Sequence, residues 1–429
     1  MCLVIISASI VGCGGSNNDG TAAQSGESGT KLGGSIEVAV IYTDTKLETF
    51  QGIVDAFTEE TGVAVDLIAP GSDYESQLRT MMASNTLPDV WSTHGWSLKL
   101  YSEYLQPVND QPWFDSMDTE ALAGVMEDEN GNFYALDLSI GLSGLIYNAD
   151  VLEEADVSLD DLTTWDGVID ACEKIKAIGV TPFVVGGAES GNLAGILGSI
   201  APTFWTDEGA VVDGKTALLD GTFDFDTYGT ELLEWFCNNF VKKGYLNKDA
   251  LTLDQTGAQQ ALGAGEAAFL LRGPDNITVA KEYYPDANLG ILPLPASQEG
   301  AKPSWRISED NAFGVWKDTE NPDAAWAFLE FLARPENAKT ITEMVGTPSA
   351  IDGVVVDNSP ACDAYNETQE RIDGWCQYDN VFDRKYFPSG MWSAMGQTMA
   401  MTISNPDDVS EAVAFLKDNY ISLYAAEHQ

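Results

Sequence analysis

The chain has 429 residues, of which 44% are hydrophobic and 21% are charged. This length favours two domains, or one large two-lobed unit, over a single compact core. The formal net charge of −46 comes from 67 acidic and 21 basic residues, and a field of that sign repels nucleic acids and anionic ligands. We therefore expect no nucleic-acid partner, and we interpret most of the acidity as a solvated surface.

An apolar run at residues 1–12 ends at Cys13, before a segment rich in Gly and Ser. The run is too short to span a bilayer and is typical of an export signal, although no Lys or Arg precedes it. The sequence around Cys13 resembles the bacterial lipobox, in which the cysteine becomes a lipidated N-terminus. We predict that residues 1–34 are a signal peptide with a flexible tether. A lipid on Cys13 would then anchor the protein to the extracellular face of a bacterial cell membrane.

Four further cysteines lie in the body of the chain. Cys172 and Cys237 fall in apolar patterns and are predicted to be buried thiols. Cys362 and Cys376 flank a polar segment, and a disulfide between them would contribute about 3 kcal/mol in the chain-entropy model. The chain has only two histidines and no CxxC spacing, so we expect no metal site and no cofactor.

The first hundred residues read as alternating strands and helices. Residues 35–43 and 63–69 have strand patterns, and between them apolar residues at helical spacing predict a helix that ends at Gly62. A strand, helix and strand in this order favour a parallel sheet. A polar helix over 74–85 and a short strand after residue 87 follow. Ligands of open α/β sheets bind at the carboxyl ends of strands, which would place the loops that follow these strands on one edge.

The middle of the chain gives further strand and helix signals. Residues 132–138 and 141–148 predict two short strands, and two glycines in the second permit a bend. Thr164 is a predicted helix N-cap, and Gly179 a predicted stop. Strand patterns over 182–187 and 267–273 are each followed by a polar loop.

The last part begins with a strand-like segment over 311–317. A helix starts after Asn321, where Asn, Pro and Asp follow one another. The chain is expected to cross between lobes near residues 346–350. An aromatic-rich loop region over 375–392 and a closing helix complete it.

Five passages resemble one family in their joint order and spacing. They are FQGIVDAFTEETGVAV, LPDVWSTHGW, GLIYNADVLEEADV with TTWDGVIDACEKIKAIG, ALGAGEAAFLLRGP, and NPDAAWAFLEFLARPENAK with GTPSA. Together they resemble the extracellular solute-binding proteins of sugar ABC transporters, of the maltodextrin-binding type. The resemblance implies a two-lobed α/β fold of the periplasmic-binding-protein kind, with a hinge and a central ligand cleft.

The same resemblance implies lobe boundaries and a function. The N-terminal lobe is expected to contain residues 35–141 and 310–347, and the C-terminal lobe residues 145–305 and 350–429, with GLSGLIYNAD as the first hinge strand. We expect a monomeric, non-enzymatic protein that captures a carbohydrate, in particular an oligosaccharide, by hinge closure. It would deliver this ligand to the permease subunits of an ABC importer.

Sugar-binding residues are expected in loops of both lobes, because aromatic faces stack on the C–H faces of sugars and carboxylates accept bonds from hydroxyls. Positions that match the family pattern are Asp44, Lys46, His94, Trp96, Glu189, Asp275 and Trp392. The family often has an aromatic residue where Asp275 stands. Candidates added because they are expected in loops at the same edge are Trp305, Asp310 and Trp375. Tryptophans predicted to pack in the core instead are Trp91, Trp165, Trp235 and Trp326.

Several alternatives remain open at this point. Asp44 is also a plausible helix cap, and Glu189 and Asp275 are equally consistent with solvated loop acids. The acidity favours, as a second function, a binding protein for a cationic small molecule such as a polyamine. A third is a glycoside hydrolase that uses two of these acids, or Asp310, as acid and nucleophile or base.

Overall fold

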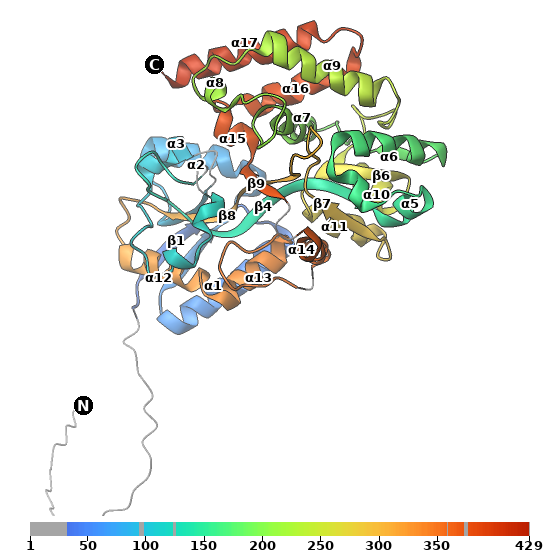
Figure 1. The fold of residues 1–429 in the computed structure, drawn as a ribbon. Helices are drawn as coiled ribbons and strands as arrows, with labels where there is room; N and C mark the ends of the chain where they lie inside the picture. Colours follow the sequence, from blue (N-terminus) through green and yellow to red (C-terminus); the bar gives the residue numbers. More distant parts are fainter. Residues whose placement is uncertain (1–31, 94–97, 123–125, 358, 373–375, 429) are drawn as a thin grey trace, which may run out of the picture.

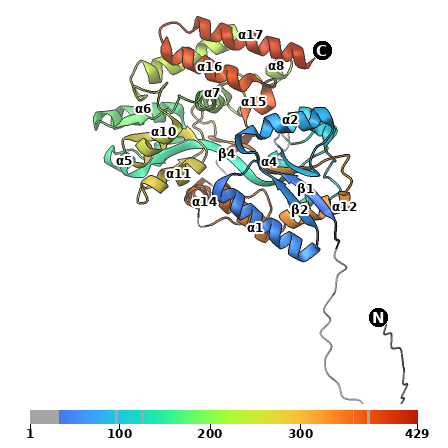
Figure 2. The same cartoon turned by 180° about the vertical axis from the view of Figure 1, so that it is seen from behind.

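The computed structural model describes residues 32–93, 98–122, 126–357, 359–372 and 376–428. It is a two-lobed α/β protein in which a pair of long strands runs between the lobes (Figure 1). The strand order is β2-β1-β3-β8-β4-β6-β5, with β7 paired to β4 and β9 paired to β8. The helices surround the two ends of this sheet, as the view from behind also shows (Figure 2).

The first lobe begins with the strand, helix and strand that the sequence predicts. The residues Phe50, Ile53, Val54 and Phe57 are all buried on one side of the first helix, and Gly62 ends it in the left-handed conformation with φ 76°. The first strand pairs in parallel with the second and the third. The elements of this lobe are β1 (Ser35–Ala39), α1 (Asp44–Thr61), β2 (Ala64–Ile68), α2 (Tyr74–Ser84), β3 (Val90–Thr93), α3 (Leu98–Tyr101), α4 (Thr119–Leu122), α12 (Pro322–Leu332) and α13 (Pro335–Val345).

The second lobe is rich in helices around a smaller group of strands. Thr164 caps α6 by accepting a hydrogen bond from the backbone of Gly167, as predicted. Its elements are α5 (Ala149–Glu154), α6 (Trp165–Ala177), β5 (Thr181–Phe183), α7 (Ser190–Trp205), α8 (Lys215–Leu219), α9 (Thr230–Phe236), α10 (Gln255–Gly263), β6 (Ala267–Arg272), α11 (Asp275–Tyr283), β7 (Leu289–Leu292), α14 (Pro360–Ile372), β9 (Gln377–Asn380), α15 (Phe382–Tyr386), α16 (Met391–Ser404) and α17 (Ser410–Glu427).

Two strands pass from one lobe to the other. β4 (Leu136–Asn148) and β8 (Ser304–Val315) are antiparallel, with Leu136 opposite Phe313 and Ser143 opposite Arg306. Beyond that point β4 pairs with β6 and β7 of the second lobe. The two short strands predicted over 132–138 and 141–148 are therefore one continuous strand, which begins only at Leu136. β8 is also longer than predicted, since residues 304–310 form a strand and not a loop.

The segment near residues 346–350 lies beside β4. The backbone N–H of Ile140 donates to the carbonyl of Pro348 at 2.8 Å, and that of Ala350 donates to Leu138 at 3.0 Å. A third stretch of chain therefore adjoins the two long strands. Ala350 and Ile351, predicted to begin the second part of the C-terminal lobe, are buried in the core of the first lobe.

The glycines of β4 allow close packing at the crossing. A methyl group on Gly144 would lie 2.4 Å from the carbonyl oxygen of Leu292 and 2.6 Å from the ring of Trp305. One on Gly141 would lie 2.4 Å from the hydroxyl of Ser308. The close approach of neighbouring strands thus requires glycine at position 144, whereas the hydroxyl at position 308 could rotate away from a methyl group on Gly141.

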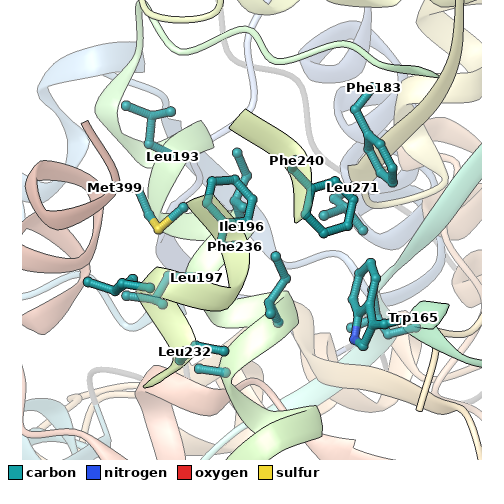
Figure 3. Packing of buried hydrophobic residues seen from close by; sticks show 14 of the residues in the cluster. Trp165, Phe183, Leu193, Ile196, Leu197, Leu232, Phe236, Phe240, Leu271 and Met399 are labelled. Carbon is teal, nitrogen blue, oxygen red and sulfur yellow. The ribbon is translucent and has the colours of Figure 1, made fainter. Parts of the chain in front are cut away.

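Separate apolar clusters fill the two lobes. The cluster in the first lobe contains residues between 36 and 138 together with residues between 312 and 351, and a larger one in the second lobe contains residues between 145 and 420. Figure 3 shows the second cluster, where the rings of Trp165, Phe183 and Phe240 pack near the side chains of α7 and α9. Trp91 and Trp165 are buried, and Trp235 and Trp326 pack at the margins of the clusters.

Among the cysteines of the described segments, Cys172, Cys237 and Cys362 are free thiols. Cys172 and Cys237 are buried, as predicted. The predicted bridge between Cys362 and Cys376 is not formed. Cys362 is a free thiol that is buried near the start of α14. Burial raises the pKa of Cys362 to about 11, as expected of an unreactive thiol.

Candidate ligand-binding site

The first lobe contributes a group of polar side chains around the start of α1 and the middle of β8. Asp44 is the first residue of α1 and has φ 51°, an uncommon backbone conformation for a residue other than glycine. Lys46 lies in the same turn. Strained backbone of this kind is found disproportionately at functional sites.

Asp310 lies within β8 and not in the loop predicted for it. Its carboxylate accepts hydrogen bonds from Thr347 Oγ1 at 3.2 Å and from Ser139 Oγ at 3.3 Å. Its backbone N–H donates to Asp137 Oδ1 at 3.1 Å. Burial raises the pKa of Asp310, and the neighbouring carboxylates Glu309 and Asp275 raise it further, while the two hydroxyl donors lower it.

Asn311, next along β8, was not predicted from the sequence. It has φ 57°, and its side chain accepts from Tyr42 Oη at 2.7 Å and donates to Ser139 Oγ at 2.8 Å. These bonds tie the end of β1 to both long strands. The sequence did not predict this linking role, because an asparagine within a strand-like segment does not reveal its distant hydrogen-bond partners.

In the second lobe, Glu189 occupies the N-cap position of α7. Its Oε2 accepts from Asn192 Nδ2 and from the backbone N–H of Gln255, both at 3.2 Å. The segment 190–192, predicted as a loop, is the first turn of that helix. Glu189 is therefore an exposed but positioned acceptor.

Asp275 begins α11 and accepts a hydrogen bond from Asn276 Nδ2 at 3.2 Å. Its side chain is open to solvent, yet protein surrounds it closely enough that desolvation raises its pKa. Arg272 and Lys46 act in the opposite direction on this pKa. Lys46 lowers the pKa of Asp275, and Asp275 raises that of Asp310, so this carboxylate lies within electrostatic range of both first-lobe groups.

Trp392 and Arg272 flank α7. Trp392 is 38% exposed in the first turn of α16, and a methyl group on Gly191 would lie 3.3 Å from its indole nitrogen. Arg272 ends β6, and a methyl group on Gly195 would lie 3.3 Å from its Nη1. Arg272 was not predicted as a site residue, because an arginine after an apolar strand reads as a solvated strand end.

Some predicted site residues are not brought together. Trp305 is 0% exposed and packs in a core cluster with Ile307 and Ile291, so the prediction that it binds ligand is wrong. The strand β8 extends through this position and turns the indole inward. His94, Trp96, Trp375 and the lipidation candidate Cys13 lie outside the described residues.

Two cavities lie in the second lobe. One, of about 20 Å³, is lined mainly by the apolar core and also by Asn192, Gln255 and Arg272. The other is a groove of about 690 Å³ between β5 and α10, and no predicted site residue lines it. Arg272 therefore lines the first cavity, together with Asn192 and Gln255, the two residues that donate hydrogen bonds to Glu189.

Two kinds of feature are absent from the described part of the chain. No group of three or more His, Cys, Asp or Glu side chains there is arranged to hold a metal ion. No described helix combines the length and the apolar character that a membrane crossing requires.

Comparison with known proteins decides the family. The model of the bacterial extracellular solute-binding proteins matches residues 43–339. The chain belongs to this family. The match includes α1, both long strands and the helices that carry Glu189 and Asp275.

Relatives of this solute-binding protein include several whose names refer to sugars. The melibiose/raffinose/stachyose-binding protein MelE of Bacillus subtilis is 30% identical over 87% of this chain and 86% of its own. A binding protein of Bacillus subtilis in an open conformation superposes with a TM-score of 0.81 at 27% identity, over 92% of this chain and 98% of its own. A sugar transporter protein of Bacillus licheniformis in complex with stachyose superposes with a TM-score of 0.75 at 32% identity, over 91% of this chain and 100% of its own.

In this solute-binding protein, the candidate site therefore combines groups from both lobes. The first lobe supplies Asp44, Lys46 and Asp310. The second supplies an exposed indole, a guanidinium and the carboxylates Glu189 and Asp275. Such a set offers hydrogen-bond donors, acceptors and an apolar face to one ligand.

Proposed function

We propose that the protein captures a neutral oligosaccharide between its lobes and delivers it to an ABC importer. The observation that carries this proposal is the exposed indole of Trp392, which shares one glycine-lined face of α7 with Arg272. In the same lobe, Asp275 interacts electrostatically with Lys46 and Asp310 of the first lobe. Sugars present apolar C–H faces and polar hydroxyls, which an aromatic ring and charged donors and acceptors match. Stachyose is in the name of MelE and is bound in the Bacillus licheniformis structure, which suggests a galactose-containing oligosaccharide of the raffinose and stachyose type as the ligand here.

Binding of the ligand would shift the protein from an open to a closed arrangement of its two lobes. A ligand that bridges both lobes binds the closed form better than the open form and shifts the population toward it. In support, the structure superposes better on the open relative than on the stachyose complex, although the second is more similar in sequence. Small-angle scattering should show a smaller radius of gyration with saturating stachyose, whereas an unchanged radius in the bound state would contradict closure.

The protein would act outside the cell and without catalysis. We propose that lipid on Cys13 tethers a monomer to the membrane, where the closed form meets the permease. The first lobe would comprise residues 35–141 with 310–347, as expected from the sequence, and also Ala350 and Ile351, which pack in its core. The second lobe would comprise residues 145–305 and the chain after residue 351. A mass increase on Cys13 after expression in a lipidating host, absent from a Cys13→Ala variant, tests the anchor.

A thermal-shift screen of mono- and oligosaccharides tests the ligand class. A ligand at one hundred times its dissociation constant stabilises the folded state by roughly 2.7 kcal/mol. Raffinose and stachyose are expected to raise the melting temperature. Stabilisation by polyamines alone would support the cationic alternative, and release of galactose or sucrose by the purified protein would support the hydrolase.

A further inference from the structure

We propose that Arg272 contacts the ligand by donating paired hydrogen bonds to neighbouring sugar hydroxyls, and that Gly195 makes room for its guanidinium. This inference rests on the proposed function and names a recognition residue within the same site. Arg272 would be a specificity-determining residue, and Gly195 a positioning residue that acts through it.

The position of Arg272 is fixed by the sheet. It is the last residue of β6 and pairs with Gly144 of β4, where the long strand enters the second lobe. The following turn carries Asp275, whose Oδ1 would lie 2.6 Å from a methyl group on Gly273. The guanidinium and this carboxylate are therefore presented by one short turn beside the crossing strands.

The guanidinium lacks protein partners. Across the described residues, Arg272 forms no hydrogen bond or ion pair, and its Nε is buried without an acceptor. The side chain is half-buried, and its pKa is lowered by burial against the opposing effects of Asp275 and Glu189. Leaving a buried donor of a charged group unsatisfied is costly in a folded protein, so the buried Nε–H calls for an acceptor. A bound ligand would supply acceptors to the fork of N–H groups.

Helix α7 leaves room for the Arg272 side chain because Gly195, on the facing side of the helix, has no Cβ atom. A methyl group on Gly195 would lie 3.3 Å from Nη1 of Arg272, closer than most such contacts, so the guanidinium would have to shift. Gly191, one turn earlier on the same face, stands in the same relation to Trp392 Nε1. The N-terminal half of α7 thus seats the aromatic and the cationic side chain next to each other.

The surrounding charges favour hydroxyls over an anionic group. Two carboxylates interact electrostatically with Arg272 without pairing with it directly. An anionic sugar would meet these carboxylates, Asp310 and a chain of net charge −46. A neutral sugar can accept from the guanidinium through two neighbouring oxygens and donate its hydroxyl protons to the carboxylates.

Isothermal titration of the full chain with stachyose tests the contact. Arg272→Met is expected to weaken binding about ten- to hundredfold, the range for hydrogen bonds from a charged donor, and Arg272→Lys to weaken it because an ammonium lacks the planar fork. The melting temperature without ligand should not fall in Arg272→Met, since the substitution removes no hydrogen bond or ion pair with the protein. A residue with a purely structural role would show the reverse, a lower melting temperature with unchanged affinity.

A coupled pair of variants tests Gly195. Gly195→Ala should weaken binding in the wild-type background and have no further effect in the Arg272→Met background, because it acts through the guanidinium. Gly52→Ala in α1 is the control, since nothing lies within 4 Å of its added methyl group. Wild-type affinity in Arg272→Met, or additive effects of the pair, would overturn the inference while the proposed function stands. A wild-type protein that binds no sugar would overturn both.

Discussion

Trp392 is the residue whose environment most resembles a sugar-stacking platform. Its ring is 38% exposed, although one edge rests on the glycine face of α7. We expect Trp392→Ala to weaken stachyose binding by about 1–2 kcal/mol, or roughly five- to thirtyfold, because the apolar face of the sugar loses its partner. Trp392→Phe should retain part of the affinity. Titration calorimetry of both variants gives the values, and unchanged affinity in Trp392→Ala would remove the stacking role.

Asp137 predicts a pH dependence of stability. Burial raises its pKa well above the ordinary value, with further increases from Glu309 and Asp310 that Arg384 only partly offsets. The folded state therefore holds this proton more tightly than the unfolded state. Its contribution to stability is fully present below the unfolded pKa, about 4, and is lost as pH rises toward and through the folded pKa.

We therefore expect Asp137→Asn to flatten the dependence of stability on pH. The amide keeps an acceptor for the backbone N–H of Asp310 but carries no charge to bury. Urea unfolding at pH 5 and pH 8 should show a smaller loss of stability at the higher pH in the variant than in the wild type. Equal losses in the two proteins would contradict the assignment of this proton to Asp137.

At the scale of secondary structure, the sequence predicted elements with clear local signals and missed those defined by distant partners. Gly62 and Thr164 end or begin helices through their own backbone or side chain, and both predictions are confirmed. By contrast, the polar residues in SWRISEDN read as a loop. They belong to a strand because Arg306 pairs with Asp207 and Glu309 pairs with Arg384, two contacts between segments far apart in the chain.

The crossing of β4 and β7 predicts a strong effect of a small substitution. Gly144→Ala would place a methyl group against the carbonyl of Leu292 and the ring of Trp305, neither of which can move freely. We expect a loss of about 1–3 kcal/mol, the usual cost of overpacking. Gly52→Ala in α1 is the matched control, since nothing lies within 4 Å of its added methyl group and helix propensity favours alanine. Chemical denaturation should separate the two variants, and equal stabilities would contradict the close packing.

The buried ion pair of Arg306 and Asp207 fixes the second-lobe end of β8. Both side chains are nearly inaccessible, and Ser304 Oγ also donates to the carboxylate of Asp207. Asp207→Ala leaves a buried guanidinium uncompensated and is expected to cost about 3–5 kcal/mol. Asp226→Ala removes an exposed pair with Lys417 and should cost no more than about 1 kcal/mol. Thermal unfolding in parallel would show the contrast, and a small effect of Asp207→Ala would mean that this pair does not anchor the strand.

At the scale of the whole molecule, the order of the sequence segments identified the two-lobed architecture and the family. The individual residues of the candidate site were harder to predict from the sequence. The resemblance to the family indicates Asp275, Glu189 and Trp392, whereas Arg272 and Asn311 emerge only when β6, α7 and β1 are placed beside the long strands. Arg272 stands out because its buried Nε has no acceptor, and Asn311 because its backbone is left-handed. The pattern of residue types along the sequence shows neither feature.

Net charge separates the central proposal from its main alternative. A cationic ligand would be attracted by a protein of net charge −46, and its binding would weaken steeply as salt screens that field, while a neutral sugar would be nearly indifferent to salt. Titration calorimetry of the purified protein with stachyose at low and high ionic strength is the most direct test. We predict saturable binding with a dissociation constant that changes less than about twofold. No heat of binding with stachyose or raffinose, together with salt-sensitive binding of spermidine, would contradict the account.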